Sequence, residues 1–162
     1  MTMTPDACHF SMSMLLKQET ALTQQLSELL DNEYAAITDK DFTSFEQIIT
    51  EKALTVEQLD LLEQERIALI ESAGHKPDPD DFLYFLQWCD PAQHITSHWE
   101  QLLTLAGKCR DQNLRNHHLI ELCSQHTRET LRVLRGEDTH TDLYSADGDT
   151  DSGHENRTLA RA

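Results

Sequence analysis

The stretch PAQHITSHWEQLLTLAGKCRDQNLRNHHLIELCSQHTRETLRVLR, residues 91–135, carries the most regular pattern in the chain. A sustained 3.5-residue repeat is typical of a helix in a left-handed coiled-coil seam. The stretch therefore predicts one long helix, with Asp90 as N-cap and Pro91 as the first helical residue. The repeat advances in alternating steps of four and three residues through Ile95, Trp99, Leu102, Ala106, Cys109, Asn113, Asn116, Ile120, Cys123, Thr127, Thr130 and Leu134.

The centre of this predicted seam is polar, at Asn113 and Asn116. Asparagines at seam positions fix the register of coiled-coil helices at a cost in stability. We expect the two side chains to form a polar layer. We also expect the C-terminal end of the seam, which carries Thr127 and Thr130, to be held less firmly than its beginning.

Residues 11–73 predict a helical hairpin, because this segment contains neither proline nor glycine. From about Met12 onward, apolar residues recur in steps close to three, four and seven, which is typical of an amphipathic helix. The polar run TDKD interrupts the pattern once, and Thr38 or Asp39 can cap the helix that follows. Gly74 then supplies a C-terminal stop.

Two series with a spacing of seven residues run through the second helix of this hairpin. They are Phe42, Ile49, Val56, Glu63 and Ile70, and Phe45, Lys52, Leu59 and Arg66. Lys52 and Arg66 thus interrupt an apolar line. We favour the interpretation that their stems lie along the edge of the seam while the charged heads reach water. The alternative is that both side chains pair with acidic groups and fix the register.

After the loop HKPDPD, Asp80 or Asp81 can cap a short helix over residues 81–89. Together these segments predict an all-α fold over residues 1–135, an elongated antiparallel helical bundle or coiled coil with a long C-terminal helix. Residues 136–162 carry seven acidic residues against two arginines, a net charge of −5, with scattered apolar side chains. Such a composition buries too little apolar surface to order itself, so a flexible acidic tail is expected.

The formal net charge of −16 disfavours nucleic acid and anionic membranes, both of which are bound through basic surfaces. No segment approaches the roughly 18 consecutive apolar residues of a membrane span. The N-terminus lacks the basic and apolar regions of a secretory signal. The four cysteines form no CxxC pair, which favours free thiols in a reducing compartment. We therefore expect a cytoplasmic protein whose partner is a basic or polar helix.

Few residues suggest catalysis or metal binding. His94 and His98 have the i, i+4 spacing of zinc ligands but lack the glutamate of HExxH, so solvated histidines are favoured. Cys123 and His126 can share a helical face, yet no second cluster of ligands accompanies them. The sequence contains no P-loop, no Rossmann glycine pattern and no GxSxG. We expect no cofactor, no metal and no enzymatic activity.

From Trp99 the chain reads W-x2-LL-x-L-x3-C-x3-N-x2-N-x3-I, followed by LRVLRG and LYSADG. These segments resemble the FlgN family of flagellar export chaperones. In that family a long C-terminal helix carries N-x2-N-G, ends in L-x-x-L-K/R and is followed by L-Y-G-x-x-G. His117 and Ser145 stand where the family has glycines. The resemblance covers about residues 12 to 150, and the matching positions are Asn113, Asn116, Leu131, Leu134, Leu143, Tyr144 and Gly148.

The resemblance implies a chaperone that holds the C-terminal helical segments of the hook-associated (hook–filament junction) proteins in the cytoplasm and prevents their premature assembly. It implies delivery of these clients to the cytoplasmic domain of the flagellar type III export gate, with Leu143 and Tyr144 as the docking element. The implied client-binding residues are Asn113, Asn116, Ile120, Cys123, Thr127, Leu131 and Leu134.

Three further points stay open at the level of sequence. A homodimer in the absence of client is compatible with exposed seams. The main alternative function is a generic coiled-coil adaptor or structural protein without an export client, and the second is an unrecognised helical enzyme. The tail discriminates against the adaptor, because an adaptor has no need of Leu143 and Tyr144 at a fixed distance from the end of the helix.

Overall fold

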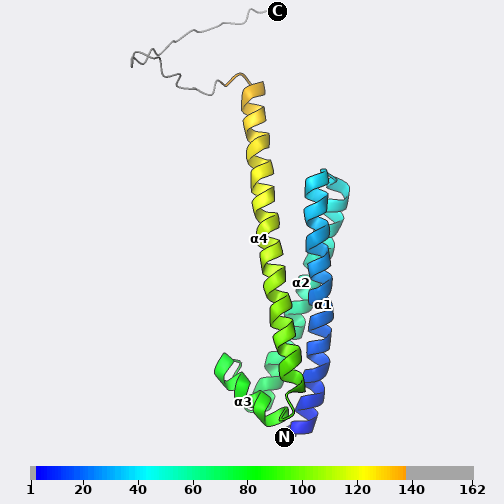
Figure 1. Ribbon diagram of the computed structural model, residues 1–162, viewed down its shortest axis with the longest axis vertical. Helices are drawn as coiled ribbons and strands as arrows, with labels where there is room; N and C mark the ends of the chain where they lie inside the picture. Colours follow the sequence, from blue (N-terminus) through cyan, green and yellow to red (C-terminus); the bar gives the residue numbers. More distant parts are fainter. Residues whose placement is uncertain (1–2, 138–162) are drawn as a thin grey trace, which may run out of the picture. The chain divides into compact units, whose positions relative to one another are not determined.

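A computed structural model of the chain describes residues 3–137, and their regular structure is entirely helical, as the sequence predicts (Figure 1). The four helices are α1 (Pro5–Asp39), α2 (Phe42–Ser72), α3 (Pro79–Cys89) and α4 (His94–Leu134). The described residues fall into two units that divide between Cys123 and Ser124, and α4 contributes residues to both. No helix within residues 3–137 combines the length and apolarity required to cross a bilayer.

The sequence pattern placed the start of the first helix near Met12, but helix α1 begins seven residues earlier, at Pro5. Thr4 is its N-cap and accepts a hydrogen bond from the Ala7 backbone nitrogen, and Pro5 occupies the first turn. The early start has a reason in the core, because Cys8 and Met12 are fully buried. These side chains help close the end of the bundle that α3 also covers.

The turn between α1 and α2 is a left-handed cap. Lys40 has φ 57°, and the Asp41 nitrogen donates to the Ala36 carbonyl at 2.9 Å. Asp41, and not Thr38 or Asp39, then caps α2, since its carboxylate accepts from the Ser44 nitrogen at 3.1 Å.

Gly74 ends α2, as expected from the sequence. It has φ 88°, and it donates to the Glu71 carbonyl at 2.9 Å while His75 donates to the Ile70 carbonyl at 3.1 Å. This pair of bonds is the Schellman arrangement, which favours glycine because an L side chain is strained at positive φ.

Two caps differ from the sequence-based expectation. Asp78 caps α3, in place of Asp80 or Asp81, because Pro79 fits the first turn and the Asp81 nitrogen then donates to Asp78 Oδ1 at 2.9 Å. Helix α4 begins at His94 and not at Pro91. Residues 91–93 form a turn instead, and the carboxylate of Asp90 reaches across it to the first turn of the helix.

The apolar core lies at the end of the bundle where α3 packs (Figure 1). It joins the beginning of α1, the end of α2, α3 and the beginning of α4. Phe82 packs edge-on against Trp99 with 4.9 Å between ring centroids. The buried members are Cys8, Met12, Leu15, Leu16, Leu69, Ile70, Phe82, Phe85, Leu86, Cys89, Ile95 and Leu102.

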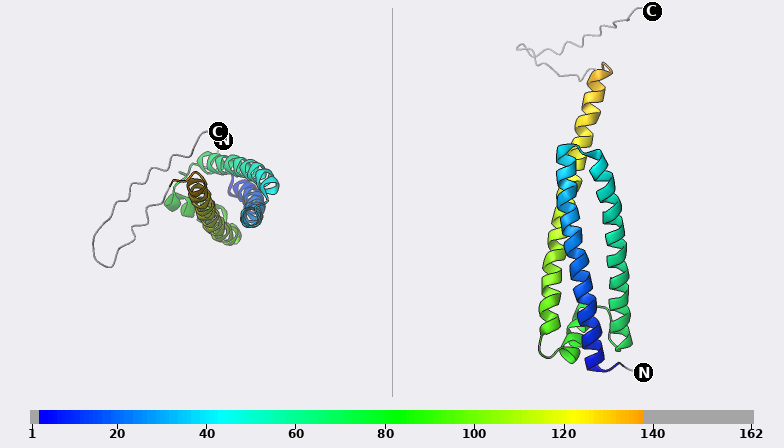
Figure 2. Two further views of the ribbon diagram at one scale, coloured as in Figure 1. Left: turned by 90° about the horizontal axis from the view of Figure 1, so that it is seen from above. Right: turned by 90° about the vertical axis from the view of Figure 1, so that its right-hand side faces the viewer.

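The buried face of α4 differs in part from the predicted seam. Cys109 and Asn116 are buried as expected, but Gln112 is buried where Asn113 was predicted. Ala106 and Ile120 are likewise exposed. The reason is that α4 packs beside two helices within the first unit, so its buried face is centred between them (Figure 2).

Two hydrogen bonds show how α4 divides its contacts. The Gln112 side chain bonds to Ser27 of α1. The Asn113 side chain accepts from Lys52 of α2 at 3.4 Å. One line of α4 side chains therefore faces α1, and the line one residue further on lies toward α2.

Candidate functional site

The middle of the first unit is held by buried charged and amide side chains. Glu33 is 1% exposed and accepts from Lys52 Nζ at 2.8 Å through one oxygen. Its other oxygen accepts from Asn116 Nδ2 at 2.7 Å. Asn116 also donates to the Leu30 carbonyl at 2.7 Å, and Lys52 reaches Asn113. We call these residues (Leu30, Glu33, Lys52, Asn113 and Asn116) the Glu33 layer.

A second layer lies two heptads away on both helices of the hairpin. Arg66 Nε donates to Glu19 Oε1 at 3.0 Å, and the guanidinium lies 4.9 Å from the centre of the Trp99 ring. Arg66 also lies 3.6 Å from Glu63. We call these four residues the Glu19 layer. Because Glu19 and Glu33, like Lys52 and Arg66, are fourteen residues apart, both layers specify the same antiparallel register.

These contacts overturn the favoured interpretation of the two cations. The side chains of Lys52 and Arg66 are only 22% and 15% exposed, and their heads turn toward buried carboxylates and not toward water. The alternative interpretation, pairing with acidic groups, is confirmed. A carboxylate in a helix interior is tolerated when a cation and further hydrogen-bond donors compensate its lost hydration.

The Glu19 carboxyl is compensated less completely than that of Glu33. Burial raises the pKa of Glu19, and the nearby Arg66 opposes this rise only in part. Glu19 Oε2 has no hydrogen-bond partner among the residues that the structure describes. The Glu19 layer is therefore the part of the bundle where charge is held at the greatest cost.

The predicted client-binding residues of the first unit lie in different environments. Asn116 is buried in the Glu33 layer, and Asn113 is exposed at its edge. Ile120 is 39% exposed, and Cys123 is exposed. The structure thus brings Asn113 and Asn116 together in one polar layer and leaves the later positions at the surface.

The second unit contains the last turns of α4. Thr127, Leu131 and Leu134 are all exposed there, Leu131 by 45% and Leu134 by 77%. Helix α4 ends at Leu134, and Gly136 follows with a φ of 69°, which allows Glu137 to donate to the Arg132 carbonyl at 3.1 Å. Leu143 and Tyr144, the predicted docking element, lie outside the described residues.

Several apolar side chains are exposed although the sequence did not predict their exposure. On α2 they include Phe42, Ile49 and Val56, and on α3 they include Tyr84 and Trp88. The seven-residue series of α2 was visible in the sequence, but its exposure depends on which helices cover it. Glu19 and Glu33 were also missed, although their spacing matches that of Lys52 and Arg66.

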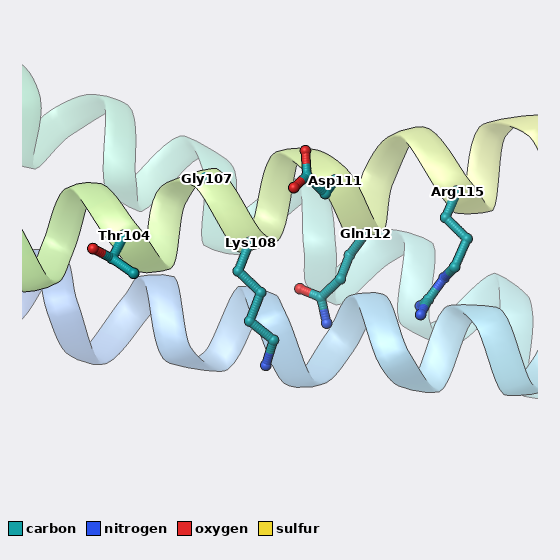
Figure 3. Close-up of a pocket in the computed structure, with 6 residues that line it drawn as sticks. All are labelled: Thr104, Gly107, Lys108, Asp111, Gln112 and Arg115. Atoms are coloured by element: carbon teal, nitrogen blue, oxygen red, sulfur yellow. The ribbon is translucent and has the colours of Figure 1, made fainter.

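An open groove of about 540 Å³ runs along α4 beside α1 (Figure 3). Arg115 in this groove lies 3.2 Å from Asp31 and over the ring of Tyr34 at 4.2 Å. Hydrogen bonds from Gln112 and then from Arg115 lower the pKa of Asp31. The groove is thus a polar crevice where two helices meet. It is lined by Thr104, Gly107, Lys108, Asp111, Gln112 and Arg115.

The histidine and cysteine pairs that were considered as metal ligands from the sequence are not joined by further ligands within residues 3–137. Within residues 3–137, no three His, Cys, Asp or Glu side chains are placed to hold a metal ion. His117 and His118 both lie near Glu121, at 3.4 Å and 3.6 Å. Cys8, Cys89 and Cys109 are buried thiols.

Long helices with charged layers inside and apolar side chains outside define a helical bundle protein with surfaces suited to binding other helices. The family model described as FlgN protein matches residues 10–152. The chain therefore belongs to the FlgN family, which consists of flagellar export chaperones and not of enzymes. No curated protein and no solved structure matches the chain significantly.

Proposed function

We propose that this chaperone holds the C-terminal helical segments of the hook-associated proteins in the cytoplasm and delivers them to the export gate. The family supports this assignment, because its members are export chaperones. The observation that carries it is the exposure of apolar side chains on the last turns of α4, where Leu131 is 45% and Leu134 77% exposed. Apolar positions on an uncovered helix suit an amphipathic helical client.

The client-binding surface is assigned to the exposed members of the predicted set, which are Ile120, Cys123, Thr127, Leu131 and Leu134. They recur at helical spacing along α4, so a client helix could lie along them. Asn113 borders this set at an exposed position, and its side-chain oxygen accepts from Lys52 at 3.4 Å, so its amide nitrogen is the group offered to a polar client. Asn116 is engaged with Glu33, so its role in the proposal is to hold α4 in place.

The test of the client site is the double substitution Leu131→Asp with Leu134→Asp. Calorimetry should show loss of binding to a peptide from the C-terminus of a hook-associated protein, because two charges would enter an apolar contact. The matched control is Leu122→Asp with Val133→Asp. These residues are 62% and 67% exposed and lie off the proposed face, so the control should bind normally. Equal loss in both variants would remove the proposed site.

Leu143 and Tyr144 are proposed as the element that docks on the cytoplasmic domain of the export gate. Tyr144→Ala should leave client-peptide affinity within about threefold, because the ring would not contact the client. It should weaken binding of the client-loaded chaperone to the gate domain. If Tyr144→Ala instead destroys peptide binding, the tail belongs to the client site.

A further inference from the structure

Helix α3 covers only one end of the long helices in the first unit. Ile70 of α2 and Trp99 of α4 both pack into the core that α3 completes, with Trp99 against Phe82. Helix α3 lies at the end of the bundle where α1 begins, and its side chains reach the end of α2 and the start of α4 through the same core (Figure 1). Because α3 has 11 residues only, it covers the faces of α2 and α4 at this end alone.

The two helix faces that α3 covers continue beyond it without a cover. On α2 the series that ends at the buried Ile70 begins with Phe42, Ile49 and Val56, which are 76%, 37% and 41% exposed. On α4 the series that starts at Trp99 continues with Ala106, Asn113 and Ile120, all exposed. The contact of Lys52 with Asn113 places the α2 and α4 faces near each other, since Ile49 and Val56 lie one turn from Lys52.

The α2 side of this uncovered face is acidic, whereas the α4 side carries the exposed Arg110, which lies 3.9 Å from Asp111. The exposed side chains Glu46 and Asp60 flank the apolar series of α2, and Glu63 lies within it. Helix α2 carries only two cations, Lys52 and Arg66, and both are engaged with buried carboxylates of α1. A helix with basic flanks therefore gains attraction here, whereas a second copy of this chain, with a net charge of −16, brings the same acidic α2.

We propose that the face formed by Phe42, Ile49 and Val56 of α2, continued by Ala106 of α4, is a second docking site. Its occupant is an amphipathic helix of a partner protein with lysine or arginine beside its apolar face. The stretch from Phe42 to Val56 rises about 21 Å, which a partner helix of about 14 residues matches. The site lies wholly within the first unit and is independent of the client surface proposed at the end of α4.

The test uses the full chain and a synthetic amphipathic peptide of about 18 residues, long enough to cover the face. Its apolar face carries leucine, and its flanks carry lysine and arginine. The comparison peptide has glutamate in place of the basic residues. Calorimetry at about 0.15 M salt should show binding of the basic peptide and not of the acidic one. At this ionic strength charges interact only over about 8 Å, so a difference between the two peptides reports charges that lie close to the acidic side chains of α2.

Two matched double variants locate the site. Ile49→Gln with Val56→Gln should weaken peptide binding about tenfold, because two half-exposed apolar side chains leave the contact. Leu54→Gln with Leu61→Gln changes two positions, each 55% exposed, with the same seven-residue separation on another face of α2. This control should stay within about twofold of the unaltered chain. Circular dichroism should show all variants folded.

Three outcomes would overturn the proposal. Unchanged binding in both double variants means that the peptide binds through charge alone. Loss of binding only in Leu131→Asp with Leu134→Asp means that the peptide occupies the end of α4, which removes this site and leaves the proposed function intact. The third outcome is that the chain self-associates and does not bind the peptide. If Ile49→Gln with Val56→Gln abolishes this self-association, a second copy of the chain is the occupant.

Discussion

Asn116 of α4 donates to the carboxylate of Glu33 of α1 at 2.7 Å, and both side chains are 1% exposed. This contact ties α4 to the hairpin at a point where the interior contains no large apolar cluster. Lys52 completes it from α2. All three long helices of the first unit thus meet at one carboxylate, and the position of α4 depends on polar geometry as well as on apolar packing.

Removing one partner of Glu33 should destabilise the bundle. Lys52→Met leaves a buried carboxylate without its cation and should lower the free energy of unfolding by about 3 kcal/mol. Asn116→Leu should lower it by about 2 kcal/mol, because Glu33 and the Leu30 carbonyl each lose a donor. The measurement is urea unfolding followed by far-UV circular dichroism. Asn113→Leu, at an exposed position, should change it by less than about 0.5 kcal/mol.

The complete apolar replacement separates pairing from packing. Glu33→Leu, Lys52→Met and Asn116→Leu together should recover most of the stability lost in the single variants, because no group is left buried and unpaired. The contrary outcome is that the free energy of unfolding of the triple variant falls by the sum of the three single losses. In that case the polar contacts of the Glu33 layer are themselves stabilising, and the explanation by unpaired buried groups is wrong.

Glu19 predicts a pH dependence of a defined sign. Its pKa is raised mainly by burial, so the folded state holds the Glu19 proton more tightly than the unfolded state does. Its contribution is therefore fully present below the unfolded pKa and is lost as pH rises through the raised folded pKa. Relative to Glu19→Gln, the unaltered chain should lose stability as pH increases above about 4.5. A pH-independent difference between the two proteins would contradict this.

The sequence predicted the helices well because their determinants are local. The segment 11–73, which has no proline or glycine, predicted α1 and α2, and the glycine at position 74 predicted the end of α2. Caps were harder, because several acidic residues stand close together. Asp78, Asp80 and Asp81 can each accept a helix N-terminal hydrogen bond, and Pro79 decides in favour of Asp78.

The buried face of α4 was predicted in part. One line, through Leu102, Cys109 and Asn116, is buried as the repeat indicated. The sequence did not show whether Gln112 or Asn113 is buried, because both side chains are polar. The hydrophobic period also does not say whether a helix packs beside one neighbour or two. Pairing of Lys52 and Arg66 with Glu33 and Glu19 depends on the register between α1 and α2, which no single-helix pattern contains.

Three thiols should be protected in the folded protein. Burial raises the pKa of Cys8 and Cys109, and burial together with Cys8 and Asp90 raises the pKa of Cys89 to about 11. Two pKa units lower the thiolate fraction about hundredfold, and burial also blocks access. Alkylation mapped by mass spectrometry should modify these residues slowly in buffer and rapidly in denaturant. Rapid native modification of Cys89 would show that α3 opens readily.

Asp90 is expected to be the most sensitive cap in the chain. Its carboxylate is 2% exposed and accepts from the backbone nitrogens of His94, Ile95 and Thr96 at 3.0, 2.7 and 3.1 Å. These are the first donors of α4, which have no partner within the helix. His9 of α1 also lies 3.5 Å from this carboxylate. One side chain therefore connects α1, the end of α3 and the start of α4.

Asp90→Ala should lower the free energy of unfolding by about 3 kcal/mol, above the usual loss for a helix cap, because one buried and two partly buried donors lose their partner together. Asp90→Asn retains an acceptor oxygen without the charge and should lose about half as much. Asp41→Ala provides the comparison, because Asp41 caps α2 at an exposed position and its loss should cost about 1 kcal/mol. The three variants are compared by urea unfolding. Equal losses for Asp90→Ala and Asp41→Ala would mean that water replaces the Asp90 carboxylate, and that the connection among the three helices at this point does not depend on it.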